Sequence, residues 1–153
     1  MGAIASGGIR ILSNDVVAAF GVPDQAIALI AANQEEELDR QERMYRDDRP
    51  ALAVRGRTII LIDDGLATGA TMRAAVTALR VQRPEQLTVA VPVAPEETCA
   101  ALRQEADEVV CLLSPQPFFA VGNWYHDFSQ ISDEEVRQLL QLANSSLQVP
   151  PRR

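Results

Sequence analysis

The chain has 153 residues and a net charge of −7, from 21 acidic and 14 basic side chains. This length predicts one domain with a substantial core, and the acidic balance argues against nucleic acid or an anionic membrane as the main partner. All the basic residues are arginines, which excludes a Walker-A phosphate loop, Schiff-base chemistry and a lysine-linked cofactor.

The N-terminal part predicts a hairpin followed by two helices. Two short apolar stretches flank a glycine pair within residues 3–12, which is typical of a β-hairpin. Ser13 or Asn14 is placed to cap a short helix that stops at Gly21. Pro23 suits the first turn of a long helix. Three i,i+4 ion pairs are expected along that helix: Glu36–Arg40, Asp39–Arg43 and Glu42–Arg46.

Strands and helices alternate in the rest of the chain. The predicted strands are 58–62, 87–93 and 109–113, and the predicted helices are 71–81, 95–106 and one that begins after a capping box at 132–135. The continuous aliphatic run of the first strand predicts burial on both faces. The order predicts an α/β fold, with a mostly parallel sheet flanked by helices and a small N-terminal hairpin. We expect one domain over residues 1–147 and a disordered tail over 148–153.

The segment from Ile59 to Thr71 carries the chemistry. An apolar strand ends in two adjacent carboxylates, Asp63 and Asp64, and a loop of glycine, alanine and threonine then leads into a helix. Ligands of open α/β sheets bind at the carboxyl ends of the strands, and small residues before a helix N-terminus let backbone N–H groups approach an anion. The segment therefore predicts a monophosphate cradle, with a ribose between the phosphate and the carboxylates.

Other readings of this segment fit less well. A Walker-B strand would need a preceding Gly-x-x-x-x-Gly-Lys loop, and a receiver domain would need a lysine. A Gly-x-Gly-x-x-Gly dinucleotide loop is absent. A purely structural turn stays open as the alternative.

The same segment resembles the phosphoribosyl pyrophosphate signature of the type I phosphoribosyltransferases. Further stretches resemble an uncharacterised bacterial subgroup of that family: 2–5, 43–46, 89–97 and 118–125. The resemblance implies that Asp63 and Asp64 hold the ribose hydroxyls, that Mg²⁺ bridges pyrophosphate and ribose, and that a nitrogenous base displaces pyrophosphate. The implied substrate-binding residues are Asp63, Asp64, Ala67, Thr68, Gly69, Ala70 and Thr71.

The chain departs from the family at three points. Ala67 stands where hypoxanthine/guanine enzymes carry an aspartate, the lid lysine of orotate enzymes has no counterpart, and only Gly7-Gly8 is available as a pyrophosphate loop. By this resemblance the N-terminal strand–loop–helix portion that grips pyrophosphate is lacking. The expected function is phosphoribosyl transfer. The alternatives are a non-catalytic module that binds phosphoribosyl pyrophosphate or a nucleoside monophosphate, or an inactive fragment.

Secondary candidates for the site are aromatic or lie on the charged helix. A base pocket or lid could use Phe118, Phe119, Trp124, Tyr125, Tyr45 and Arg46, although a small hood, a dimer contact or a solvated helix face explains them equally well. We assign no general base and no direct metal ligand. His126, the single histidine, is expected to be structural.

The remaining features concern compartment and assembly. Cys99 and Cys111 have neither redox nor zinc spacing, and two buried reduced thiols are expected. No secretory signal or apolar run of membrane-spanning length is present in the sequence. We expect a cytoplasmic protein that covers an exposed sheet edge by forming a homo-oligomer.

Overall fold

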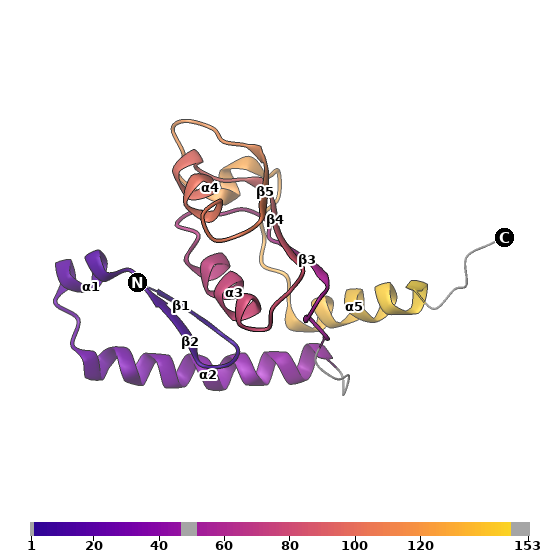
Figure 1. The fold of residues 1–153 in the computed structure, drawn as a ribbon, viewed down its shortest axis with the longest axis horizontal. Coiled ribbons are helices and arrows are strands. Elements are labelled where there is room, and N and C mark those ends of the chain that lie inside the picture. Colours follow the sequence, from indigo (N-terminus) through magenta and orange to yellow (C-terminus); the bar gives the residue numbers. More distant parts are fainter. Residues whose placement is uncertain (1, 47–51, 148–153) are drawn as a thin grey trace.

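The computed structural model describes residues 2–46 and 52–147. The elements run in chain order as β1 (Gly2–Ala5), β2 (Ile9–Leu12), α1 (Asn14–Phe20), α2 (Asp24–Arg46), β3 (Thr58–Ile62), α3 (Ala70–Val81), β4 (Gln86–Val93), α4 (Glu96–Leu102), β5 (Glu108–Leu113), the 3-10 turn η1 (Val121–Trp124) and α5 (Asp133–Leu147). Figure 1 shows the long helix α2 below the hairpin β1–β2, with α3 between the hairpin and the sheet.

A three-stranded parallel sheet forms the centre of the fold. Its order is β3-β4-β5, and the register pairs Ile62 with Ala90 and Ala90 with Val110. Each strand is joined to the next by one helix, because parallel strands need a crossover connection. The α/β fold class, the parallel sheet and the small antiparallel hairpin predicted from the sequence are confirmed.

The core lies on one face of this sheet, beneath α3 and α4. Leu87, Val89 and Val91 of β4 project from the middle strand and are almost completely buried. They pack with Val76 of α3 and Leu102 of α4. Both crossover helices therefore cover the same face, and they anchor the loops at the carboxyl ends of the strands.

The hairpin and α2 form a layer on the far side of α3. The strands β1 and β2 contact α3, and β1 also contacts α2. Arg10 of β2 bonds to Glu35 of α2 at 2.9 Å, and Ser6 in the hairpin turn bonds to Glu42. The helix α3 thus lies between two layers, and its N-terminal loop is placed at their junction.

The prediction that β3 is buried on both faces is wrong. Ile59 and Leu61 pack against the core, but Ile60 is 59% and Ile62 77% exposed. On the same outer face, Leu112 of β5 is 73% exposed. The reason is that both crossover helices lie on the other side of the sheet, and no described element covers this face.

Two local expectations about helix ends and pairs also need correction. The helix opened by Pro95 ends at Leu102 rather than Ala106, because residues 103–106 form a turn before β5. Arg40 pairs with Glu37 and with Asp133 of α5 instead of Glu36, whereas the Asp39–Arg43 and Glu42–Arg46 pairs form at 3.9 Å.

The predicted caps are confirmed in part. Gly21 ends α1 with a positive φ of 57°, but Ser13 makes no side-chain cap bond at its start. Ser132 accepts the N–H of Glu135 at 3.3 Å, as its capping-box spacing predicts. None of the helices within 2–46 and 52–147 is long and apolar enough to cross a bilayer. The predicted tail, 148–153, lies outside the described residues.

Candidate functional site

The loop between β3 and α3 lies across the carboxyl end of the sheet. The N–H of Asp63 bonds to the carbonyl of Ala90 at 3.4 Å, and the N–H of Leu66 bonds to the carbonyl of Val93 at 3.0 Å. The Leu66 side chain is buried in the core. The loop is therefore bonded to β4 at two points. The residues between and after these points lie at the carboxyl end of the sheet.

Asp63 and Asp64 stand side by side at the start of this loop. The Asp63 carboxylate accepts the N–H of Asp64 at 3.0 Å. Burial raises the pKa of Asp64, and the neighbouring Asp63 charge raises it further, while the Gly65 N–H opposes both. No ion pair within residues 2–46 and 52–147 uses either carboxylate. Both can accept hydrogen bonds from a ligand.

The second half of the loop presents backbone N–H groups. Gly69 has a φ of +70° and immediately precedes α3, whose first turn begins at Ala70. The Thr68 hydroxyl lies 3.5 Å from the Ala70 nitrogen. Among the hydrogen bonds of the described part of the chain, none takes up the N–H of Ala67, Thr68 or Gly69. Ala67 and Thr68 are exposed to solvent, so this stretch can receive an anion.

The turn η1 packs directly on the loop that carries Asp63 and Asp64. The Tyr125 hydroxyl donates to the carbonyl of Asp64 at 2.6 Å. A Cβ at Gly65 would meet the Val121 side chain at 2.6 Å and the Val93 carbonyl at 2.9 Å, so only glycine fits there. Trp124 is adjacent to Tyr125 and partly exposed. The structure thus brings Trp124 to the neighbourhood of the loop.

Two of the other predicted pocket and lid residues, Tyr45 and Arg46, lie in a different part of the fold. Tyr45 donates to Asp133 at 2.6 Å, and Arg46 pairs with Glu42 at 3.9 Å, at the junction of α2 and α5. Phe118 lines a shallow groove with Pro95, and Phe119 is 79% exposed. None of these four has a described contact with Asp63–Thr71.

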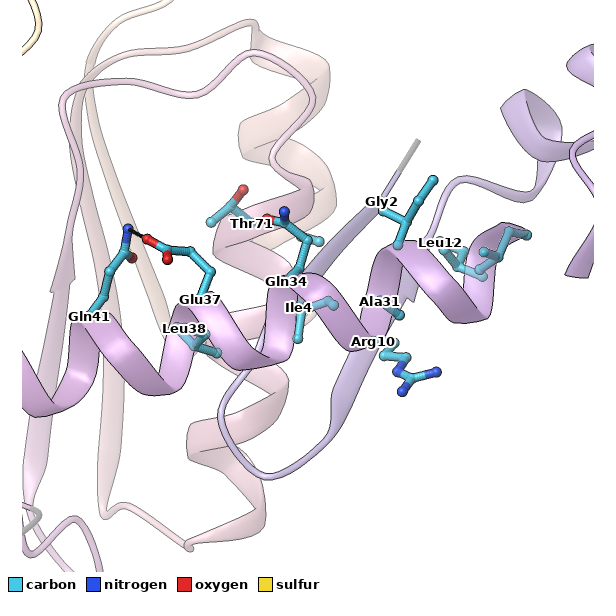
Figure 2. A pocket seen from close by; sticks show the side chains of 13 residues that line it. Gly2, Ile4, Arg10, Leu12, Ala31, Gln34, Glu37, Leu38, Gln41 and Thr71 are labelled. Atoms are coloured by element: carbon cyan, nitrogen blue, oxygen red, sulfur yellow. Dashed lines mark hydrogen bonds between the residues drawn. The ribbon is translucent and has the colours of Figure 1, made fainter. Parts of the chain in front are cut away.

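A groove of about 400 Å³ opens beside the loop at Thr71, between the hairpin and α2 (Figure 2). Its walls are apolar side chains such as Ile4 and Leu38, together with the amides of Gln34 and Gln41. Gln41 bonds to Glu37, one turn away on α2, at 3.0 Å along one wall of this groove. Since the Arg10 guanidinium at its edge is already paired with Glu35, the groove does not supply a cation for an anionic ligand.

One residue that touches the loop is missed by sequence reasoning. It is Thr98 of α4, whose hydroxyl donates to the carbonyl of Ala67 at 2.9 Å. A signal for Thr98 exists, because it follows the strand 86–93 at the same carboxyl edge of the sheet. Tyr125 is one of the aromatic candidates from the sequence, but nothing in the sequence pattern indicates its hydrogen bond to the Asp64 carbonyl.

Comparisons with known proteins agree with this geometry. A family model described as phosphoribosyl transferase domain matches residues 3–126. Two relatives from Mycobacterium tuberculosis, strains CDC 1551 / Oshkosh and ATCC 25618 / H37Rv, are each named "Putative phosphoribosyl transferase" and are 39% identical over 143 residues. The match covers 94% of this chain but 32% of each relative, so the chain spans about a third of their length.

A solved structure shows the same fold. The crystal structure of TT1426 from Thermus thermophilus has a TM-score of 0.70 and 39% sequence identity to this chain. The similarity covers 90% of this chain and 64% of TT1426.

Proposed function

Because the chain belongs to the phosphoribosyl transferase domain family, we propose that it binds phosphoribosyl pyrophosphate and transfers the phosphoribosyl group to a nitrogenous base, releasing pyrophosphate. The type I resemblance seen in the sequence agrees with the family match and with the structural neighbour. The names of the two relatives specify no acceptor base.

One observation carries this proposal: two carboxylates that form no ion pair with any described residue stand directly before a loop whose N–H groups, from Ala67 to Gly69, take part in no described hydrogen bond. A carboxylate accepts hydrogen bonds from hydroxyls, and a helix N-terminus accepts negative charge. A ribose 5-phosphate unit carries both groups, hydroxyls at one end and a phosphate at the other. We therefore assign the ribose hydroxyls to Asp63 and Asp64, and the 5′-phosphate to Ala67–Thr71.

The chemistry proposed for this site follows from charge. As the bond from C1 of the ribose to pyrophosphate breaks and the bond to the base nitrogen forms, positive charge develops on the ribose ring. In this proposal the carboxylates of Asp63 and Asp64, which hold the ribose hydroxyls, also stabilise that charge. Ala67 has no proton acceptor in its side chain, and we assign no general base, so the base nitrogen loses its proton to solvent or to the departing pyrophosphate.

Magnesium fits the donor set of this site only in part. Within the described residues no group of three or more histidine, cysteine or acidic side chains could enclose a metal ion. Mg²⁺ is commonly bound by one or two carboxylates plus substrate phosphates, and Asp63 and Asp64 would supply the carboxylates. A bound ion would neutralise the diphosphate charge, which this chain cannot do with lysine.

A second function is favoured by the glycine pair. Gly7 and Gly8 have φ angles of +85° and +74° and form the hairpin turn, where Ser6 bonds to Glu42 of α2. These glycines close the hairpin turn, which is bonded to α2. This supports the alternative of a non-catalytic module that binds phosphoribosyl pyrophosphate or a nucleoside monophosphate.

Calorimetry tests whether the chain binds these ligands. We expect phosphoribosyl pyrophosphate, AMP or GMP to bind, with Mg²⁺ strengthening the binding of the diphosphate compound. A screen for pyrophosphate release across nucleobases then separates the two functions, because release with a base requires transfer. If none of the three compounds binds with or without Mg²⁺, both ligand-binding functions are wrong.

We also propose that the chain acts as a homo-oligomer, because the outer face of the sheet is apolar and no element among residues 2–46 and 52–147 covers it. Ile60, Ile62 and Leu112 are exposed there, and parallel sheets are normally covered on both faces. Sedimentation velocity should show a dimer or larger species at micromolar concentration, and Ile62→Asp should shift it toward the monomer. A wild-type monomer throughout the micromolar range would contradict this proposal.

We also propose that the protein is located in the cytoplasm. Cys99 and Cys111 are both free thiols, as expected in a reducing compartment. Cys99 is buried as predicted, while Cys111 is only partly buried. Burial and a hydrogen bond with Cys111 raise the pKa of the Cys99 thiol to about 11, which keeps it protonated and unreactive at neutral pH.

A further inference from the structure

Two hydroxyl groups from outside the loop hold two of its carbonyl groups. Thr98 of α4 donates to the Ala67 carbonyl at 2.9 Å, and Tyr125, just after η1, donates to the Asp64 carbonyl at 2.6 Å. These donors come from two different connections, 31 and 61 residues away from the carbonyls they hold. The loop is therefore held from both ends by side chains that play no part in the proposed ligand contacts.

Holding a carbonyl group also sets the direction of an N–H group. In a planar trans peptide the C=O and the following N–H point in opposite directions. The Ala67 carbonyl points to α4, so the Thr68 N–H points away from α4. By the same geometry, the bond from Tyr125 to the Asp64 carbonyl orients the Gly65 N–H, which lies close enough to the Asp64 carboxylate to oppose the rise of its pKa.

The Thr98 side chain contacts the loop a second time through its methyl group. A Cβ at Gly69 would lie 2.8 Å from Thr98 Cγ2, so the methyl group fills the space that a side chain at position 69 would need. The hydroxyl and the methyl of one residue thus engage two neighbouring loop residues. Their roles can be separated, because valine keeps the methyl and serine keeps the hydroxyl.

We infer that Thr98 and Tyr125 are positioning residues that form a hydroxyl clamp on the ligand loop. Thr98 holds the Thr68 N–H toward the phosphate position, and Tyr125 holds the peptide that orients Asp64 toward the ribose position. Carbonyl oxygens that would otherwise repel an anion are engaged by donors on the opposite side. This inference rests on the proposed function, since it assigns the clamp to the same ribose 5-phosphate site.

Ligand titration of single variants tests the clamp. Thr98→Val should weaken binding of both ribose 5-phosphate and inorganic phosphate by about five- to tenfold, the size of effect typical of one lost hydrogen bond. Thr98→Ser should restore binding to within about twofold of wild type, because the hydroxyl is kept. Tyr125→Phe should weaken ribose 5-phosphate to a similar extent but leave inorganic phosphate unchanged, since it acts through Asp64.

Thr77→Val is the matched control for these variants. Its hydroxyl also donates to a backbone carbonyl, that of Arg73 at 2.8 Å, but within α3 and away from the loop. It should bind both ligands as wild type does. Urea denaturation of each variant establishes that it is folded at the titration temperature, and Tyr125→Phe keeps the ring contact with Phe128, whose centroid is 5.2 Å away.

The possible results distinguish failure of the clamp from failure of the proposed function. If wild type binds ribose 5-phosphate but Thr98→Val and Tyr125→Phe bind it equally well, the clamp is wrong and the proposed function stands. If Thr98→Ser loses as much affinity as Thr98→Val, the methyl packing and not the hydroxyl holds the loop, which also overturns the clamp. If wild type binds neither ribose 5-phosphate nor inorganic phosphate, the proposed function fails and the clamp fails with it.

Discussion

Replacing Asp64 by Asn should weaken binding of ribose 5-phosphate by about ten- to a hundredfold, because a hydrogen bond to a charged group contributes about 1.5–3 kcal/mol. The substitution keeps the size of the side chain but removes the charge and presents N–H donors to hydroxyls that themselves donate. The Asp64 carboxylate has no ion pair among the described residues, so folding should be little affected. Isothermal calorimetry measures the affinity.

Asp39→Asn provides the control with the same change of charge. Asp39 forms a 3.9 Å pair with Arg43 on an exposed face of α2, and exposed pairs contribute little to stability. The pH dependence gives an independent check. Since burial and Asp63 raise the pKa of Asp64, the advantage of wild type over Asp64→Asn should shrink as the pH falls, and should begin to do so above the range of an ordinary aspartate. Equal affinity of the two proteins at neutral pH would contradict the assigned role.

Replacing Leu102 by Ala should lower the free energy of unfolding by about 2–5 kcal/mol, the usual cost of a large-to-small change in a close-packed core. Leu102 is completely buried and packs with Val76 and Leu87 beneath the sheet. It also lies near Gly69, where an added Cβ would be 3.9 Å from its Cδ1. The cavity would therefore loosen α4 against both the sheet and the ligand loop. Urea denaturation monitored by circular dichroism measures the loss.

Leu29→Ala is the matched control for the core variant. Leu29 lies on α2 and is 64% exposed, so the same chemical change should alter the free energy of unfolding by no more than about 0.5 kcal/mol. If the two variants were destabilised equally, the assignment of the core to the face beneath α3 and α4 would be wrong.

The pattern of the sequence predicted most of the elements, and the errors have physical causes. Hydrophobic periodicity and turn residues are local patterns, set by residues within a few positions of one another. They therefore predicted the hairpin, the three strands, the helix end at Gly21 and the helix start after Ser132. The end of α4 could not be predicted in this way, because the turn after Leu102 is held by distant residues: Arg73 and Arg80 of α3 both bond to Glu105. Arg40 pairs with Glu37 and Asp133 and not with Glu36 for a similar reason, since α5 brings Asp133 to it.

The burial of β3 shows the limit of composition more clearly. Five aliphatic and β-branched residues in a row are compatible with cover on one face or on two. Ile59 and Leu61 face the core, whereas Ile60 and Ile62 face outward. Whether a strand is covered on one face or on both depends on where the other layers of the fold lie, and the path of the whole chain decides that.

For the ligand loop too, the sequence predicted some features and the tertiary structure determined others. By itself the sequence determined the loop's identity: a strand that ends in Asp63 and Asp64, then small residues, then a helix, on a chain that has no lysine at all. This is possible because the motif is contiguous, and its chemistry follows from adjacent residues. The tertiary structure decided which hydrogen bonds hold the loop in place, because Thr98 and Tyr125 reach it through space from distant connections. It likewise decided that Tyr45 and Arg46 lie at the junction of α2 and α5, since contacts between remote segments are set by packing and leave no local pattern in the sequence.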